Sequence, residues 1–314
     1  MNSLTDFSLK EEYKHLEVLG DKLSEIDSLI NWKPFRPIIS GMYYNKTEAG
    51  GRPNNDEIVM LKMLVLQQWH GLSDPELERQ CLDQISFRKF LGFPTKIPDY
   101  SAVWYFRERL AKTGKDNEIW NELQRQLESL SLKIKKGMIQ DTTFIHSDPG
   151  HAKANTPRGK DAKTRRSKDG TWTKRGSTSH FGYKLHTIMD TEYQLIRRIE
   201  TTTASLHDSQ VDLSSEGEVV YCDRGYFGAK AKGFDATMRR GVRGHPIEIR
   251  DVLRNGRISR KRSKCERGYA VIKNMFGAGH VMVTTVKRAA VRMTMAAFNF
   301  NLYQLRTLKR QKVI

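Results

Sequence analysis

Apolar residues in the first part of the chain recur at the spacing of amphipathic helices. The earliest stripe, with intervals of three and four residues, consists of Leu16, Leu19, Leu23, Ile26 and Ile30. This periodicity predicts one helix with one apolar face, because positions three and four apart lie on the same side of an α-helix. Pro34 and Pro37 predict its end, since proline lacks the amide proton that a helix interior requires.

Further helices are predicted up to about residue 130. The next one runs from about Asn55 to a stop at Gly71, and a capping box with an early proline at 73–76 begins another. The remaining predicted helices are 85–91, ending at Gly92, a helix from a Ser101 cap to Gly114, and a segment with Ile119, Leu123 and Leu127. Short helices joined by tight turns are typical of helix-turn-helix DNA-binding domains. The pattern therefore predicts an all-helical DNA-binding domain over 1–135.

The pattern changes after Lys136, where short runs rich in β-branched and aromatic residues replace the helical periodicity. Strands are predicted at 138–144, 181–189, 195–203 and 219–222. Helical spacing returns from Arg257, and an apolar helix over 281–305 is expected to cover one face of the sheet. The remainder of the chain, 136–314, is thus predicted to be an α/β domain.

The chain is strongly basic. Lysine and arginine outnumber aspartate and glutamate by 54 to 36, which gives a net charge of +18. A clustered excess of this size favours a polyanion partner such as DNA over a surface that serves only solubility. Candidate phosphate contacts in the helical part are Arg79, Arg88, Lys89, Arg107 and Arg109, although a solvated helix face is an equally good interpretation for any one of them.

A long polar segment, 147–179, separates the first two predicted strands and is rich in lysine and arginine. It predicts a mobile loop or β-ribbon that becomes ordered on DNA, with Arg165 and Arg166 as candidate contacts. The alternative is a solvated loop that touches nothing. Trp172 within it is placed either to stack on a base or to pack the ribbon.

Cysteine usage and the absence of export signals indicate a reducing compartment. Cys81, Cys222 and Cys265 are too few and too scattered for a disulfide framework, and no CxxC pair predicts a zinc site. The first residues lack the basic and apolar regions of a signal peptide. The apolar run 58–66 is short and interrupted by Lys62, so it predicts a core helix rather than a membrane span.

Three acids have settings that predict a divalent metal site. Asp141 lies inside the apolar run 137–144, Asp223 ends the run 219–223, and Glu266 follows a basic helical stretch. Carboxylates at strand centres and strand ends are typical ligands of hard cations. For Glu266 an ion pair with Arg262, four residues earlier, is an alternative, and Lys273 is expected to face the same way seven residues later.

Other candidate ligands are weaker. Asp148 and Asp208 are alternative carboxylates, with a loop-capping role favoured for Asp208. A histidine metal cluster can be drawn from a set near the first two strands, but phosphate or surface contacts are the favoured interpretation: His146, His151, His180 and His186. Cys222 is expected in the core, because it points away from the face of Asp223 on a strand.

Several separate motifs occur along the chain in a fixed order. They are GRP at 51–53, LSDPELE at 72–78, FLG at 90–92, FRERL at 106–110, HFGYKLH at 180–186, TTTASLHDS at 201–209 and DRGY at 223–226. With them, the chain resembles a DDE-type insertion-sequence transposase, most like the insertion sequence five family. The resemblance covers roughly residues 50 to 305.

The resemblance implies a ribonuclease H-like fold, a mixed sheet flanked by helices, near 137–314. It also implies that the three catalytic acids are Asp141, Asp223 and Glu266. The family's glutamate-helix signature places tyrosine, arginine, glutamate and lysine at fixed spacing, and Arg262, Glu266 and Lys273 match it. The tyrosine position falls on Ser259, so a role tied to that tyrosine is not carried over.

The implied chemistry is phosphodiester hydrolysis with two Mg²⁺ ions about 4 Å apart, with Mn²⁺ as a possible substitute. Asp141 would bridge the ions, and Asp223 and Glu266 would each hold one. Arg262 and Lys273 are expected to position phosphates, with Lys184 as a further candidate. The same site would cut the ends of an element and join their 3′-hydroxyl groups to target DNA.

The sequence thus predicts a transposase of a mobile element that binds terminal inverted repeats in double-stranded DNA. Two DNA ends must be paired, so a homodimer or higher assembly is expected, with no membrane partner, in the cytoplasm of a prokaryotic cell at the nucleoid. A metal-dependent nuclease without strand transfer and an inactive DNA-binding protein from a decayed element remain alternatives. Intact acids at all three positions argue against decay.

Overall fold

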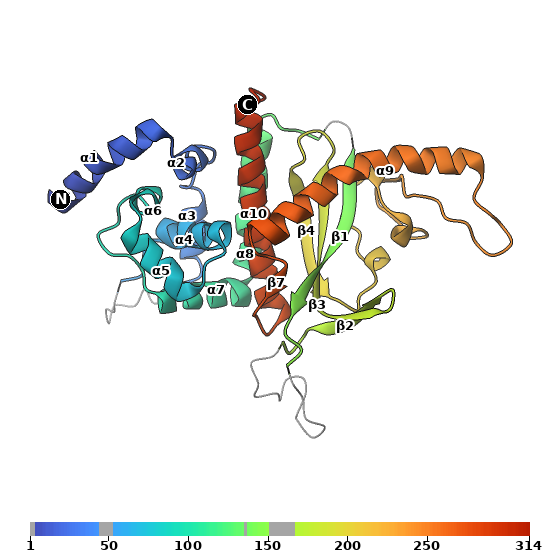
Figure 1. Cartoon of the computed structure of the whole chain (residues 1–314), viewed down its shortest axis with the longest axis horizontal. Helices are drawn as coiled ribbons and strands as arrows, with labels where there is room; N and C mark the ends of the chain where they lie inside the picture. The colour runs from blue at the N-terminus through green and yellow to red at the C-terminus, as the bar shows by residue number, and fades with distance from the viewer. Residues whose placement is uncertain (1–3, 44–52, 135–136, 151–166) are drawn as a thin grey trace, which may run out of the picture. The chain divides into compact units, whose positions relative to one another are not determined.

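The computed structural model describes residues 4–43, 53–134, 137–150 and 167–314 (Figure 1). The chain forms two compact units. The first contains Met1–Ser131 together with Leu302–Ile314, and the second contains Leu132–Asn301. Within the described residues no helix is long and apolar enough to cross a membrane.

The part of the first unit before Ser131 is helical throughout its described residues. Its helices are α1 (Leu4–Leu19), α2 (Lys22–Asp27), α3 (Phe35–Ser40), α4 (Glu57–His70), α5 (Asp74–Asp83), α6 (Ile85–Phe90), α7 (Tyr100–Thr113) and α8 (Lys115–Ser129). In α4 every residue from Val59 to Trp69 is buried, which confirms the predicted core helix. The buried Lys62 is accommodated because its ammonium group donates to the carbonyl of Phe90 (2.8 Å) and pairs with Asp27 (2.6 Å).

Most helix ends follow their predicted signals. Ser73 caps α5 by accepting from the amide of Glu76 (3.4 Å), and Gly71 and Gly114 end α4 and α7 in the left-handed conformation. The predicted Ser101 cap is wrong: Asp99 caps α7 by accepting from the amide of Ala102 (2.8 Å). The helix begins before Ser101, whose hydroxyl instead donates to Oδ1 of Asp99 (2.6 Å).

The predicted single helix through Leu16 and Ile30 is also wrong. It breaks after Leu19, because Gly20 adopts a φ of +88° that ends α1. Asp21 then caps α2 by accepting from the amide of Leu23 (2.9 Å). The apolar stripe continues across the break, so periodicity alone does not reveal it.

Among its described residues, the second unit is built on a mixed, seven-stranded sheet. Its strands are β1 (Met138–Ser147), β2 (Thr171–Arg175), β3 (Thr178–Asp190), β4 (Ile196–Thr203), β5 (Val219–Tyr221), β6 (Phe234–Asp235) and β7 (His280–Val281). The order is β2-β3-β1-β5-β6, with β4 also paired to β3 and β7 to β1. Pairings with β3 are antiparallel, whereas β5 and β7 run parallel to β1.

Two long helices pack on this sheet. Helix α9 (Ile249–Ala270) crosses β1 and continues into a π-helical turn at Val271–Met275, and α10 (Val286–Arg310) follows (Figure 1). Gly268 permits close packing, since a Cβ there would lie 2.8 Å from Cε of Met189 on β3. A mixed sheet flanked by helices is the predicted fold class.

The two faces of β1 have different surroundings. Asp141 pairs in register with Thr187 of β3, whose hydroxyl lies 2.8 Å from the Tyr269 hydroxyl of α9. Successive side chains on a strand point to opposite faces, so the neighbouring Thr142 and its partner His186 face away from α9. That second face is covered by the segment that includes the short 3₁₀ helices Asp208–Gln210 and Arg224–Tyr226.

Part of the predicted basic ribbon is described. Strand β2 pairs with β3, and Trp172 packs against Phe181 with ring centroids 5.3 Å apart while remaining 58% exposed. Arg165 and Arg166 lie outside the described residues, as does the whole stretch 151–166 of this segment.

Candidate metal centre

Asp141 and Asp223 meet at a single arginine. Arg262 on α9 donates a hydrogen bond from Nη2 to Oδ2 of Asp141 (2.9 Å). The same nitrogen lies 4.0 Å from Oδ2 of Asp223. Two carboxylate oxygens that are 82 residues apart in sequence therefore converge on one cationic atom.

The other oxygen of each acid is held by the backbone. Oδ1 of Asp141 accepts from the amide of Thr142 (2.9 Å), and Oδ1 of Asp223 accepts from the amide of Gly225 (2.8 Å). The Asp223 bond caps the 3₁₀ helix that follows β5. Each carboxylate thus has one oxygen fixed and one oxygen directed toward Arg262.

The two acids and Arg262 are partly shielded from solvent. The side chains of Asp141 and Arg262 are each 17% exposed, and that of Asp223 is 42% exposed. Burial raises the pKa of Asp141, while the charge of Arg262 and the amide of Thr142 oppose that rise and the nearby Asp223 adds to it. Arg262 therefore offsets part of the cost of keeping a carboxylate in a partly buried position.

Glu266 is not drawn into this group. It is exposed on α9, one turn after Arg262, and makes no hydrogen bond or ion pair with any described residue. The alternative ion pair with Arg262 is not formed, since that guanidinium is turned to Asp141. Across 4–43, 53–134, 137–150 and 167–314, no three His, Cys, Asp or Glu side chains are placed to hold a metal ion.

The donor set nevertheless fits a hard divalent cation at two of the three acids. Carboxylate oxygens suit Mg²⁺ and Mn²⁺, and the Oδ2 atoms of Asp141 and Asp223 already share a cation. Glu266 lies at the adjoining helical position, because residues four apart on a helix are neighbours. A change in the direction of its side chain is needed before it joins the pair.

A buried polar chain behind Asp141 was not anticipated. The hydroxyl of Thr142 lies 2.8 Å from Nδ1 of His186 and 2.6 Å from the Tyr226 hydroxyl, and Nε2 of His186 lies 2.8 Å from the Thr202 hydroxyl. His186 is fully buried, and burial lowers its pKa to about 4. The interpretation of His186 as a surface or phosphate contact is therefore wrong. The hydrogen bonds of Thr142 to His186 and Tyr226 thus join β1 to the 3₁₀ helix that Asp223 caps.

Two family models match the chain. One, described as a transposase domain (DUF772), matches residues 10–109, and the other, described as a transposase DDE domain, matches residues 138–302. The second spans more than half of the 314 residues. This chain belongs to the DDE transposase family. No solved structure was found to match it. The family acts on DNA and depends on divalent metal, and the second unit has the ribonuclease H-like architecture of a DDE domain.

Two lysines that were predicted to bind phosphates, Lys184 and Lys273, have different structural surroundings in the transposase. Lys184 donates to the carbonyl of Leu206 (2.7 Å) and pairs with Asp208 (2.8 Å). It shares the strand face of His186, which is opposite to that of Asp141. Lys273 lies in the π-helical turn near the end of β1, where burial lowers the pKa of His146 and the charges of His180 and Lys273 add to that effect.

The structure also gives the positions of the other residues that were considered as metal ligands, core residues or phosphate contacts of the transposase. His146 and His180 have ring centroids 5.4 Å apart, whereas His151 lies outside the described residues. Cys222 is buried in an apolar cluster with Met138, which confirms its predicted place in the core. In the helical unit Arg107 is bonded to both carboxylate oxygens of Asp74, at 2.7 and 2.5 Å.

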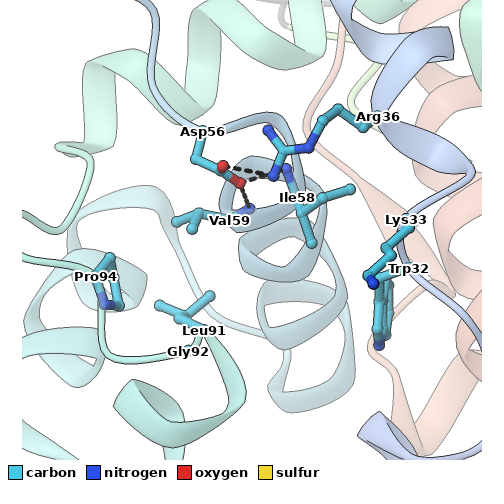
Figure 2. Close-up of a pocket in the computed structure, with 9 residues that line it drawn as sticks. All are labelled: Trp32, Lys33, Arg36, Asp56, Ile58, Val59, Leu91, Gly92 and Pro94. Atoms are coloured by element: carbon cyan, nitrogen blue, oxygen red, sulfur yellow. Dashed lines mark hydrogen bonds and ion pairs between the residues drawn. The ribbon is translucent and has the colours of Figure 1, made fainter.

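The transposase also has a hollow in its helical unit (Figure 2). It is lined by Trp32, Lys33, Arg36, Asp56, Ile58, Val59, Leu91, Gly92 and Pro94. Arg36 is neutralised by Asp56 (2.7 Å) and Glu57 (2.5 Å), and Asp56 also caps α4. Within this hollow Arg36 and Asp56 thus satisfy each other, and no role is assigned to it.

Proposed function

We propose that this transposase binds the terminal inverted repeats of its insertion sequence, cuts the DNA by metal-dependent hydrolysis and joins the 3′-hydroxyl ends to target DNA. The convergence of Asp141 and Asp223 on one cationic position, within the matched DDE domain, is the observation that supports it. Asp141, Asp223 and Glu266 are the proposed metal ligands. Two Mg²⁺ ions, or Mn²⁺ in their place, would supply an activated nucleophile and charge stabilisation on the leaving oxygen.

The residues of the chain have separate roles in this proposal. The backbone bonds to Oδ1 of Asp141 and of Asp223 orient their Oδ2 atoms, so the site needs little reorganisation at these two ligands. Glu266 completes the ligand set by turning toward them. Lys273 and Arg262 hold DNA phosphates, and Lys184 serves that purpose only if its bond to Asp208 opens.

The DNA partner is double-stranded and consists of the element's ends and the target. The helical region over 1–135 is the proposed end-binding domain, 136–314 the proposed catalytic domain, and the basic 147–179 segment, with Arg165 and Arg166, a further proposed DNA contact. Pairing of two ends requires a homodimer or larger assembly. Action at the prokaryotic nucleoid and the narrower insertion sequence five relationship belong to the same proposal.

Cleavage and joining of DNA that carries the element's terminal repeats test this proposal. In Mg²⁺ the unaltered protein should produce both products, and Asp223→Asn should lower both rates by about a hundredfold or more, because a metal ligand is lost. Asp235→Asn is the matched control, since Asp235 is an exposed carboxylate in the same unit whose Oδ1 also accepts from the amide two residues later, that of Thr237.

The other outcomes separate the alternatives. Equal activity of the unaltered protein and Asp223→Asn would refute the assigned centre. Cleavage without joining would favour a nuclease. Binding of the repeats with neither product would favour an inactive protein from a decayed element.

A further inference from the structure

Arg262 occupies the position toward which the two acids direct their free oxygens. Its Nη2 is 2.9 Å from Oδ2 of Asp141 and 4.0 Å from Oδ2 of Asp223. The contact is intramolecular and partly buried, with 17% of the Arg262 side chain exposed. A guanidinium in this place neutralises two carboxylates that would otherwise repel each other.

The same side chain has an unused donor. Nε of Arg262 is buried and has no hydrogen-bond partner in the described part of the chain. Such a donor costs free energy when it is left unpaired. A phosphate would use it, because Nε and one Nη of a guanidinium form a pair of parallel hydrogen bonds to two phosphate oxygens.

A divalent cation would compete with Arg262 for these oxygens. A metal ion on Oδ2 of Asp141 would lie close to the guanidinium that now bonds to that atom. Two cations at such a distance repel strongly in a partly buried site. Glu266, one turn further along α9, is free of other described partners and can take the place beside the metal that the arginine leaves.

We propose that Arg262 is the resident counter-ion of Asp141 and Asp223, and that a divalent cation displaces it, which frees its guanidinium for a DNA phosphate. The inference rests on the proposed function only in taking the two acids as metal ligands. Metal loading and phosphate binding are then coupled through one side chain. By linkage, each strengthens the other, because both favour the released state of Arg262.

The displacement is tested on the whole protein without DNA, using Mn²⁺ alone as the probe. Binding is followed by the loss of the free-ion electron paramagnetic resonance signal. Arg262→Met should bind Mn²⁺ at least about tenfold more tightly than the unaltered protein, because the competing charge is gone. Arg260→Met is the matched control and should change affinity less than twofold, since Arg260 is exposed on the same helix and, among the described residues, its side chain bonds only to the carbonyl of Gly256.

A second measurement uses the unaltered protein and so does not depend on a variant's folding. Arginines are modified with phenylglyoxal, and the rate at each site is read by peptide mass spectrometry. Without metal Arg262 should be protected, and Mn²⁺ should raise its modification several-fold while Arg260 stays unchanged. Asp223→Asn, which weakens metal binding, should abolish that rise.

The outcomes distinguish this inference from the proposed function. If Mn²⁺ binds in a manner that requires Asp223 but Arg262 stays protected, the counter-ion role is overturned and the metal centre stands. Unchanged or weaker Mn²⁺ binding by a folded Arg262→Met also overturns the role. If neither the unaltered protein nor Arg262→Met binds Mn²⁺, the metal centre itself fails, and the displacement fails with it.

Discussion

Asp141 and Asp223 each commit one carboxylate oxygen to a nearby backbone amide. This division matters because a carboxylate with both oxygens free rotates, whereas Asp141 and Asp223 each present a defined Oδ2. Behind Asp141, the hydroxyl of Thr142 joins His186 to Tyr226 and so ties β1 to the turn that Asp223 caps. The position of one acid relative to the other therefore depends on residues that touch no substrate.

His186 should make stability depend on pH. Its folded pKa, about 4, lies below the ordinary value of 6.5 because the ring is buried. The unfolded chain therefore takes up a proton first, and stability is lost as pH falls from about 6.5 to about 4, by at most about 3 kcal/mol. Thermal unfolding of His186→Gln should show a shallower decline over this range than the unaltered protein.

His15→Gln is the control for this experiment, since His15 is exposed on α1. It should follow the pH profile of the unaltered protein. A decline in His186→Gln as steep as in the unaltered protein would show that other groups carry the pH dependence.

At the scale of elements, the end of the sheet depends on a single amide side chain. Asn301 on α10 accepts from the amide of Ile196 (2.9 Å) and donates to the Ile196 carbonyl (2.8 Å). Strand β4 pairs with β3 in the described sheet. Asn301 thus bonds to both backbone groups of Ile196, at the start of β4, and fastens α10 there.

Asn301→Ala should lower the free energy of unfolding by about 2 to 4 kcal/mol, because it removes two hydrogen bonds to the backbone of the buried Ile196. Denaturant unfolding of the whole chain measures the loss. Lys287→Ala, at an exposed position of the same helix, should cost less than about 1 kcal/mol. A loss of less than about 1 kcal/mol in Asn301→Ala as well would show that the Asn301 bonds contribute little to stability.

Element boundaries also show what local signals can and cannot decide. Gly71 and Ser73 act as predicted because a helix cap involves only residues within one turn. The break at Gly20 is different. Leu19 and Leu23 keep helical spacing across it, and α1 is separated from α2 by the left-handed backbone of Gly20 and the extended backbone of Asp21.

At the scale of the whole molecule, the net charge of +18 makes DNA affinity depend on salt. Each phosphate that a lysine or arginine neutralises releases a condensed counterion, so the logarithm of the binding constant falls linearly with that of the salt concentration. The slope of this line therefore reports the number of phosphate contacts.

Lys273→Gln should lower that slope by about 1, as expected for one lost phosphate contact. Fluorescence anisotropy of a labelled terminal repeat over a range of salt concentrations measures it. Lys184→Gln should leave the slope unchanged, since Lys184 is paired with Asp208 on the strand face opposite to Asp141. A lower slope for Lys184→Gln alone would reverse these two assignments.

The sequence by itself determined the features that depend on neighbouring residues: most of the helices and their caps, the principal strands, the excess of positive charge and the ordered motifs of a DDE transposase. Those motifs also singled out Asp141, Asp223 and Glu266. Only the tertiary structure decided how these residues meet. The β1–β3 register set which side chains share the face of Asp141 and separated Lys184 from it. The packing of α9 brought Arg262, rather than Glu266, to the two acids. Such contacts join residues far apart in the chain, and their geometry depends on strand register and helix packing, which no local pattern encodes.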